Sequence, residues 1–265
     1  EVSELLGRTA TPADRHVIFD ATLDELYALA YRAQSLNHVI ILLDSFSSKT
    51  ILADLTLRVP KLDLSLLKSP YAIQSIREGT HEFSSPEVVS AIKSAIPSHK
   101  FTYKQPASTI IVFINDQQVH VGIDVCNLDL SKRSYKVFPN SFSLKGPIAY
   151  ALLKIGQATK EMSILDPFAR DGTISIEAAL WQTGLPVRFF DKKKLSCLTP
   201  FDLASLDTAR LPSATIIAAD SAFNNIAAAK KNAKIADIYT AISFRHYREK
   251  DLDLAFKDNT VDRMV

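Results

Sequence analysis

The sequence is poor in glycine and cysteine. Glycine occurs only seven times in 265 residues, so each one marks a place where the backbone needs a conformation or a close approach that other residues resist. The two cysteines, Cys126 and Cys197, are isolated, and two cysteines are too few for the disulfide framework of a small secreted domain. We interpret both as core or incidental residues with no disulfide between them.

Long apolar stretches and a strong net charge are also absent. No apolar run approaches the roughly 18 to 20 residues that a membrane span needs, and the polar start at Glu1 does not resemble a signal peptide. We therefore expect a cytoplasmic protein without a membrane partner. The net charge is only +2, so a nucleic-acid partner would have to meet local basic clusters and not a field of the whole molecule.

What is present is the composition of an ordinary globular protein, with 47% hydrophobic and 23% charged residues. The length allows two domains, or three small ones, each with its own core. The fold class must therefore come from the pattern along the chain.

The first 62 residues alternate helix and strand signals. Residues 23–34 space their apolar side chains as one face of an amphipathic helix, and 39–43 is a continuous run of Val, Ile and Leu that predicts a buried strand. With a helix at 2–7 and a strand at 17–19, this order predicts a small α+β layer of ferredoxin type.

Residues 63–128 predict a second α+β unit. Residues 71–76 alternate as a strand, and 84–87 is a helix start with a proline in its first turn. Two strands at 110–114 and 119–124 are joined at Asn115, which indicates a hairpin.

The stretch 164–180 organises the second half of the chain. A short apolar strand turns sharply at 166–173 into a helical segment, which leaves free backbone N–H groups at the carboxyl edge of a parallel sheet, where cofactors bind. Another apolar strand ends in Asp220, and an acidic residue at such a strand end accepts hydrogen bonds from ribose hydroxyls. Further strands at 241–244 and 261–265 complete the prediction of an α/β sheet with a nucleotide-type crevice.

Between these strands lies a polar insertion, 189–214, that contains the lysine run 192–194. Such a charge run is most often a solvated loop.

Residues 166–179 resemble the loop D-P-F-C-G-S-G-T-I-x-I-E-A-A of class I methyltransferases that use S-adenosylmethionine (SAM), in the form found in THUMP-containing RNA guanine-N2 methyltransferases. Three more segments resemble this family. Residues 129–137 are similar to its L-x-K-R-x-Y-R segment, with Lys136 in place of Arg, 143–153 to its L-K-[EG]-x-x-A helix, and 220–233 to its G-S-D to N-A segment. Residues 71–124 resemble the core of a THUMP domain, which in that family receives the 3′ acceptor end of tRNA.

The resemblance implies an α/β protein whose N-terminal ferredoxin-like domain (1–62) and THUMP domain (63–128) are followed by a linker (129–147) and a Rossmann-like methyltransferase domain (148–265). It also implies SAM as the cofactor and RNA, foremost tRNA, as the partner. The residues it places at the cofactor are Leu144, Lys145, Asp166, Pro167, Phe168, Ala169, Asp171, Gly172, Thr173, Asp220 and Ser221. The residues expected at the RNA are Arg77, Lys93, Lys100, Lys104, Lys132, Arg133 and Tyr135.

The loop departs from the family pattern at three consecutive positions. Ala169, Arg170 and Asp171 stand where the family has Cys, its first glycine and Ser or Thr. The Arg170 side chain could point to solvent or fill the cofactor pocket. On the third strand, Arg248 stands where the family often has an Asp, with Asp251 three residues later.

The family's catalytic tetrad, N-P-P-Y or N-L-P-W-G, follows the fourth strand, and the sequence contains neither Asn-Pro-Pro nor Asn-Leu-Pro. We therefore assign no catalytic residue and no metal ligand. We expect the 265 residues to be a fragment of a longer enzyme, and we expect this fragment by itself not to methylate RNA.

Two other interpretations stay open. One is a tRNA-binding protein with an inactive methyltransferase-like domain, which Arg170 and the missing tetrad favour. The other is a dinucleotide-binding oxidoreductase, which the absence of G-x-G-x-x-G disfavours. The modified nucleotide, the choice between tRNA and rRNA, and the oligomeric state stay open as well.

Overall fold

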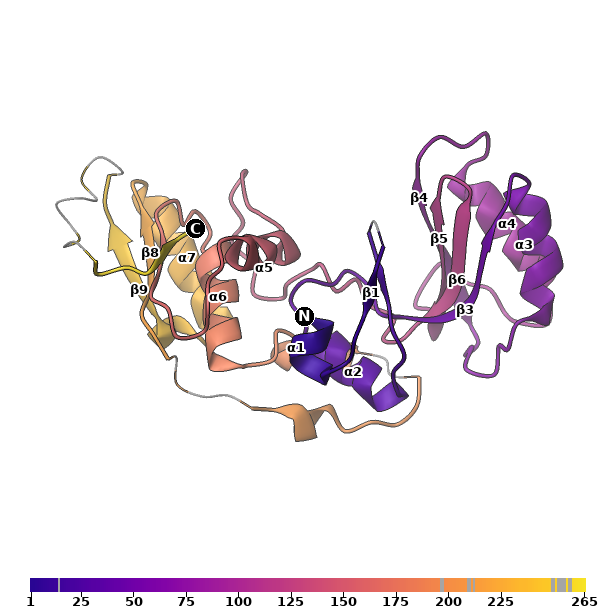
Figure 1. Ribbon diagram of the computed structural model, residues 1–265, viewed down its shortest axis with the longest axis horizontal. Coiled ribbons are helices and arrows are strands. Elements are labelled where there is room, and N and C mark those ends of the chain that lie inside the picture. Colours follow the sequence, from indigo (N-terminus) through magenta and orange to yellow (C-terminus); the bar gives the residue numbers. More distant parts are fainter. Residues whose placement is uncertain are drawn as a thin grey trace. The chain divides into compact units, whose positions relative to one another are not determined.

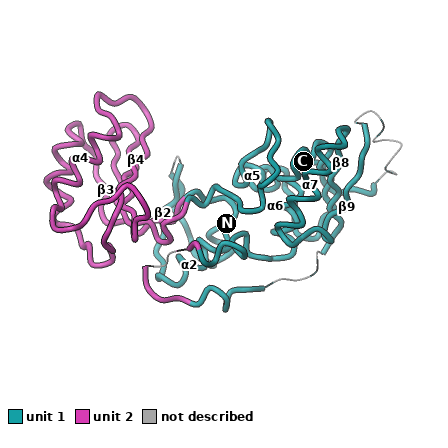
Figure 2. The backbone as a smooth tube through the Cα atoms, turned by 180° about the vertical axis from the view of Figure 1, so that it is seen from behind, with its two compact units in different colours: residues 1–37, 129–193, 202–265 teal, residues 38–128, 194–201 magenta. Residues whose placement is uncertain are grey.

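The computed structural model describes residues 1–13, 15–195, 198–208, 211, 213–248, 251, 256 and 259–265. The chain forms two compact units, coloured in Figure 2. Unit 1 comprises residues 1–37, 129–193 and 202–265, and unit 2 comprises residues 38–128 and 194–201. Within the described ranges, no helix combines the length and the apolar character that a membrane crossing requires. Cys197, which we interpreted as a core or incidental residue, lies outside the described residues.

Unit 2 is a mixed four-stranded sheet with two helices (Figure 1). The strand order is β3-β6-β5-β4, with β4 and β5 parallel and the other pairs antiparallel. The elements in chain order are β3 (Ile40–Ser47), α3 (Ile51–Arg58), β4 (Tyr71–Glu78), α4 (Ser85–Ala95), β5 (Ser108–Asn115) and β6 (Gln118–Asp124).

Helix α4 begins where the sequence predicts it. The Glu87 carboxylate accepts the backbone N–H of Ser84 at 2.8 Å, and the two residues form a capping box that satisfies free donors of the first turn. Val88, Ile92 and Ile96 are buried in the core of unit 2 and form the apolar face of this helix.

The run 39–43 was expected to form a buried strand of an N-terminal domain, and strand β3 differs from this expectation in its burial and in its partner strand. This strand does not belong to an N-terminal layer formed by residues 1–62, because it pairs with β6 in the sheet of unit 2. It is an edge strand, and most of its side chains are half-buried or exposed, with Leu42 at 42% exposure. A continuous apolar run predicts a strand well, but it does not tell a central strand from an edge strand.

Unit 1 contains a four-stranded parallel sheet in the order β10-β7-β8-β9, covered by helices. Its core joins the sheet to α5, α6 and the end of α7. The elements of this sheet and its helices are α5 (Gly146–Ile155), β7 (Ile164–Asp166), α6 (Thr173–Thr183), β8 (Ile216–Asp220), α7 (Phe223–Ile235), β9 (Ile242–His246) and β10 (Arg263–Met264).

The N-terminal segment belongs to the same unit. It forms α1 (Val2–Leu6), the short antiparallel strands β1 (Thr11–Pro12) and β2 (Val17–Ile18), and α2 (Leu23–Arg32). Glu4 on α1 accepts hydrogen bonds from the Trp181 indole on α6 and from Lys154 on α5, both at 3.0 Å. These contacts hold residues 1–37 within unit 1, so the predicted domain 1–62 is divided between unit 1 (1–37) and unit 2 (38–62).

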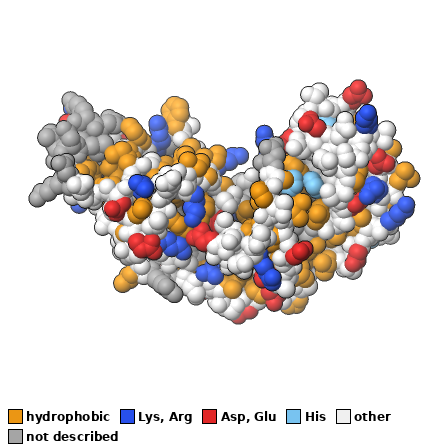
Figure 3. Space-filling view, in the orientation of Figure 1, with side chains coloured by type: hydrophobic (Ala, Val, Ile, Leu, Met, Phe, Trp, Pro, Cys, Tyr) orange, Lys and Arg blue, Asp and Glu red, His pale blue; other side chains and the backbone are white. Residues whose placement is uncertain are grey.

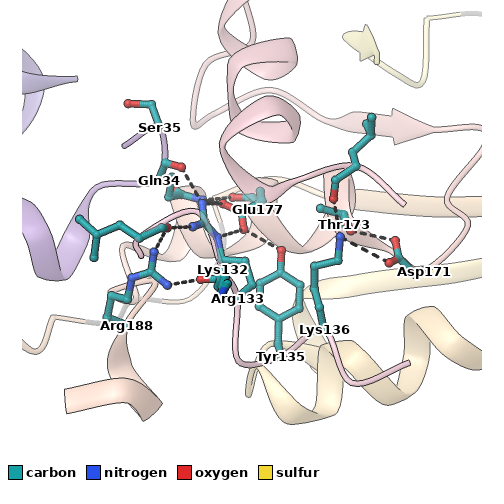
Figure 4. Close-up of polar contacts among 12 residues, drawn as sticks. Gln34, Ser35, Lys132, Arg133, Tyr135, Lys136, Asp171, Thr173, Glu177 and Arg188 are labelled. Carbon is teal, nitrogen blue, oxygen red and sulfur yellow. Dashed lines mark hydrogen bonds and ion pairs between the residues drawn. The ribbon is translucent and has the colours of Figure 1, made fainter. Parts of the chain in front are cut away.

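A buried ion pair fastens three distant segments of unit 1 together (Figure 4). The Glu177 carboxylate on α6 accepts hydrogen bonds from Arg133 at 2.7 and 3.1 Å, from the Tyr135 hydroxyl at 2.6 Å and from the Gln34 amide at 2.8 Å. The Arg133 and Glu177 side chains are 0% exposed. Burial raises the pKa of Glu177, but the charge of Arg133 and these hydrogen bonds outweigh it, so the pKa lies below its ordinary value.

Replacement of Glu177 by Ala should lower the free energy of unfolding by about 3 to 5 kcal/mol, because the buried Arg133 charge would lose its partner. The double variant Arg133→Met with Glu177→Leu should recover part of this loss, since it removes both charges. Urea unfolding measures the effect, and Glu161→Ala, an exposed glutamate of the same unit, is the matched control with an expected change of roughly 0.5 kcal/mol or less. A loss below about 1 kcal/mol for Glu177→Ala would contradict the importance of this ion pair.

Candidate functional site

The candidate site lies at the carboxyl edge of the parallel sheet in unit 1. Asp166 ends β7 and Asp220 ends β8, and these strands are parallel neighbours, so both acids stand at the same edge. The loop from Pro167 to Gly172 connects β7 to α6 at this edge. This is the strand, loop and helix arrangement that the sequence predicts.

Asp220 holds the loop against β8. Its carboxylate accepts the backbone N–H of Arg170 at 2.9 Å, the backbone N–H of Ala222 at 2.8 Å and the side-chain amide of Asn225 at 3.0 Å. The residue is 5% exposed. Because a carboxylate has about four acceptor positions, these three bonds leave room for one further donor.

The backbone of the loop uses the left-handed region twice. Gly172 has φ +83°, and a Cβ on this residue would lie 2.9 Å from the Ala229 Cβ of α7, so only glycine fits. Arg170 has φ +49°, which is the conformation that a glycine would adopt without strain. The loop therefore keeps a glycine-like backbone path at Arg170, and the half-exposed side chain of this residue stacks on the Phe142 ring, 5.0 Å from its centroid.

Asp171 joins the loop to the segment that leads into α5. Its carboxylate accepts hydrogen bonds from the Ser143 hydroxyl and, at 2.8 Å, from the Thr173 hydroxyl. The Lys136 ammonium lies 3.7 Å from the same carboxylate and donates to the Leu144 carbonyl (Figure 4). Lys136 and Asp171 both depart from the family pattern described above, and in the structure they contact each other.

Asp166 is the most perturbed acid of the site. It is 1% exposed, and its Oδ2 accepts the Ser175 hydroxyl at 2.9 Å, while its Oδ1 has no hydrogen-bond partner among the described residues. Burial raises the pKa of Asp166 to about 7, against the lowering effects of the Ser175 hydroxyl and of the backbone N–H groups of Phe168 and Ser175. A buried acceptor without a partner suits a site that receives a donor or a cation from a ligand.

The other residues expected at the cofactor lie around this loop. Pro167 and Ala169 are buried, and Phe168 is 55% exposed. Lys145 precedes α5 and is exposed, and Ser221 is exposed directly after β8. Arg248 is exposed after β9, and its carbonyl accepts the backbone N–H of Asp251 at 2.9 Å.

Two asparagines of α7 contribute to the site, although the sequence analysis assigned them no role. The buried Asn232 amide donates to the Asp171 carbonyl at 2.9 Å and to the Phe138 carbonyl at 3.0 Å. Asn225 donates to Asp220, as described, and its side-chain oxygen accepts the Asn140 amide at 2.8 Å. The match of Asn232 and Ala233 to the N-A pair that ends the family segment is the sequence feature that could have indicated a role for Asn232.

Two of the residues expected at RNA are unavailable to it. Arg133 and Tyr135 are 7% and 3% exposed, and both are bonded to Glu177 inside unit 1. Their expected role in RNA binding is therefore wrong in this structure, since neither side chain can reach a phosphate or a base. Lys132 in the same segment has an 82% exposed side chain.

In unit 2, three of the four expected cations gather at one end of the sheet. The Lys93 ammonium lies 5.2 Å from the centroid of the Phe101 ring, which packs edge-on against Tyr103, and Lys100 and Lys104 are exposed next to these rings in the chain. We call the set Lys93, Lys100, Tyr103 and Lys104 the lysine–tyrosine cluster. Tyr103 is 84% exposed. Figure 3 shows basic and acidic side chains interspersed on the face that it draws, in keeping with the low net charge.

Arg77 is separated from this cluster. It stands near the end of β4, whereas Lys100 lies beside the start of that strand, where its carbonyl accepts the Tyr71 backbone N–H. The Arg77 guanidinium donates to the Ser85 hydroxyl and the Phe83 carbonyl, which anchors it within unit 2. The cluster therefore excludes Arg77.

Replacement of Asp166 by Asn should remove part of the pH dependence of stability. The folded-state pKa of about 7 lies above the value of about 3.9 in an unfolded chain, so the folded state binds more protons between these two pH values. The free energy of unfolding therefore falls as the pH rises from about 4 to about 7, in total by about 4 kcal/mol, and falls no further above that. Urea unfolding at several pH values should give a difference in the free energy of unfolding, wild type minus Asp166→Asn, that becomes more negative by about 4 kcal/mol between about pH 4 and pH 7. A difference that does not change with pH contradicts the raised pKa.

Comparison with known proteins agrees with this geometry. The RMKL-like methyltransferase domain matches residues 133–265, and the THUMP domain matches residues 49–124. The tRNA (guanine(6)-N2)-methyltransferase of Archaeoglobus fulgidus is 30% identical over 212 residues, which cover 74% of this chain and 50% of the relative. The chain thus spans about half the length of that relative.

Solved structures share the fold. A protein of Listeria monocytogenes, described as a predicted N6-adenine-specific DNA methylase, superposes with a TM-score of 0.78 at 21% identity over 98% of this chain and 72% of its own. A methyltransferase complexed with SAH has a TM-score of 0.76 at 18% identity, over 97% of this chain and 74% of its own. With the match over residues 133–265, the chain belongs to the family of proteins with an RMKL-like methyltransferase domain, preceded here by a THUMP domain.

Proposed function

We propose that the protein containing this chain transfers a methyl group from SAM to RNA, at guanine N2 of a tRNA. The observation that carries the proposal is the loop 166–173, held at the carboxyl edge of a parallel sheet by Asp220 in a chain of the RMKL-like methyltransferase family. The curated relative named a tRNA (guanine(6)-N2)-methyltransferase supports the choice of substrate. A tRNA substrate also favours the cytoplasm as the location.

The residues at the carboxyl edge fit SAM. When bound, SAM supplies an activated methyl group. Asp166 offers a buried carboxyl oxygen without a partner, and Asp220 keeps one acceptor position free for a hydroxyl. Helix α6 begins directly after Gly172 at the same edge, and no side chain among the described residues caps its N-terminus. Leu144, Lys145 and Ser221 frame this region and complete the proposed cofactor site.

We propose the lysine–tyrosine cluster as part of the RNA-binding surface. The Lys93 ammonium lies over the Phe101 ring, which packs against the exposed Tyr103 ring, and the exposed Lys100 and Lys104 are close to Tyr103 in the chain. Such a set suits a strand whose phosphates pair with the cations while one base stacks on the tyrosine ring. Lys132 is the exposed cation of the segment 129–137 and joins this proposal. Arg77, Arg133 and Tyr135 do not, because their side chains are engaged within their own units.

Replacement of Lys93, Lys100 and Lys104 by Glu should weaken tRNA binding and reduce its salt dependence. The log-log slope of affinity against salt should become smaller by about 0.7 for each single-strand phosphate contact that is lost. Fluorescence anisotropy with labelled tRNA measures both quantities. Lys49→Glu, an exposed lysine near the opposite end of the sheet, is the matched control and should leave the slope unchanged. An equal effect of the control would argue against a localised site.

The reaction itself is tested with labelled SAM and unmodified tRNA. We expect the protein containing this chain to form N2-methylguanosine, and the 265 residues alone to form none, because they contain neither Asn-Pro-Pro nor Asn-Leu-Pro to orient the weakly nucleophilic amine. N2-methylguanosine from the 265 residues would show that the catalytic residues lie among them. Methylated adenine as the product would support methyl transfer to RNA but show that the target base is adenine and not guanine.

One observation favours a second candidate function. Arg170 replaces the glycine of the family loop, and this suits a tRNA-binding protein with an inactive methyltransferase-like domain. Binding of tRNA without any methylation by the longer protein would select this alternative.

A further inference from the structure

Arg170 is an unexpected residue for its backbone conformation. With φ +49° it lies in the left-handed region, where a residue with a Cβ costs about 1 to 2 kcal/mol more than glycine. The loop needs this conformation because the backbone N–H of Arg170 donates to Asp220 and that of Gly172 donates to the Ala169 carbonyl at 2.6 Å. Glycine would make the same backbone bonds without the strain, so the backbone gives no reason for an arginine. Strain of this kind points to a function of the side chain.

The Arg170 side chain has little to hold it within the described part of the chain. Its one recorded side-chain contact there is the Phe142 ring, 5.0 Å from the guanidinium carbon. Arg58 and Arg133, by comparison, each form a two-bond pair with a carboxylate. The five N–H donors of the Arg170 guanidinium are therefore available to a ligand, and the planar group is suited to bind an oxyanion with two parallel hydrogen bonds.

The surroundings keep this guanidinium beside the cofactor loop. Phe142 is 71% exposed, but its neighbours in the chain are fixed, because Ser143 donates to the Asp171 carboxylate and the Leu144 carbonyl accepts from Lys136. A ring that stacks on the guanidinium restricts its motion while leaving N–H groups free to donate. The Phe142 ring thus keeps the positively charged Arg170 side chain beside the loop where SAM and the RNA would meet in the proposed reaction.

We propose that Arg170 is an oxyanion-binding residue of the site and that Phe142 positions it. This inference rests on the proposed function, in which two anionic groups come to this loop. One is a phosphate of the RNA next to the target nucleotide, and the other is the carboxylate on the amino-acid end of SAM. Both present oxygens that a guanidinium binds in the same way, so the experiment has to separate them.

The test compares Arg170→Gly with the wild-type protein for binding of SAM and of tRNA. A phosphate contact predicts that the Kd for tRNA rises about 10-fold or more and that the log-log salt slope falls by about 0.7, with the Kd for SAM unchanged. A carboxylate contact predicts that the Kd for SAM rises about 10-fold or more, with tRNA binding unchanged. In that case a SAM analogue with a methyl-esterified carboxylate should bind both proteins equally.

Further variants separate this role from a structural one. Because Arg170→Gly relieves strain, its urea midpoint should equal or exceed that of the wild-type protein, whereas loss of a structural residue would lower it. Arg170→Lys should restore part of the lost affinity, and Phe142→Leu should weaken binding less than Arg170→Gly does. Lys193→Ala, an exposed cation elsewhere in unit 1, should change neither Kd.

Three results would overturn the inference. Both Kd values could stay within twofold in Arg170→Gly, or both could rise in proportion to a fall in the urea midpoint. A wild-type protein that binds neither SAM nor tRNA would contradict the proposed function together with the role of Arg170. Binding by the wild-type protein without any effect of Arg170→Gly would contradict the role of Arg170 alone.

Discussion

The organisation of unit 1 depends on one buried carboxylate. Glu177 lies on α6 without access to water, and donors on Gln34, Arg133 and Tyr135 satisfy it. A buried charge is tolerated only when it is paired and hydrogen-bonded, so two segments, one with Gln34 and one with Arg133 and Tyr135, are bound to one place on α6. The same helix begins directly after the loop 166–173. The ion pair therefore fixes the N-terminal segment and the linker against the helix that carries the candidate cofactor site.

The candidate site repeats this principle on a smaller scale. The carboxylates of Asp220 and Asp171 accept hydrogen bonds mainly from groups of the protein itself, and these bonds fix the conformation of the loop. Of these three acids, Asp166 has a buried oxygen without a hydrogen-bond partner among the described residues, and its burial raises its pKa. A preformed loop with one unsatisfied acid is an arrangement that binds a ligand with little reorganisation. Two departures from the family pattern also make contacts at this loop. The Lys136 ammonium lies near the Asp171 carboxylate, and the Arg170 guanidinium stacks on the Phe142 ring.

Charge on this protein acts locally. With a net charge of +2, the molecule has no strong field to attract RNA, and the exposed lysines of the lysine–tyrosine cluster gain their significance from the aromatic rings beside them. Several other cationic side chains stabilise the fold. Arg77, Arg133 and Lys136 are bonded to groups within their own units. A basic residue near a family motif is therefore a candidate for RNA binding only when its side chain is not engaged within the protein.

The sequence by itself determined the elements and the edge of the sheet where the site lies. The helix start at Ser84, the hairpin at Asn115 and the turn from Asp166 to Thr173 depend on residues close together in the chain, so local patterns predict them. Only the tertiary structure decided that β3 is an edge strand and that Arg133 and Tyr135 face inward. The partner of Arg133 is 44 positions away, and burial depends on which surfaces meet in space, which no local pattern records.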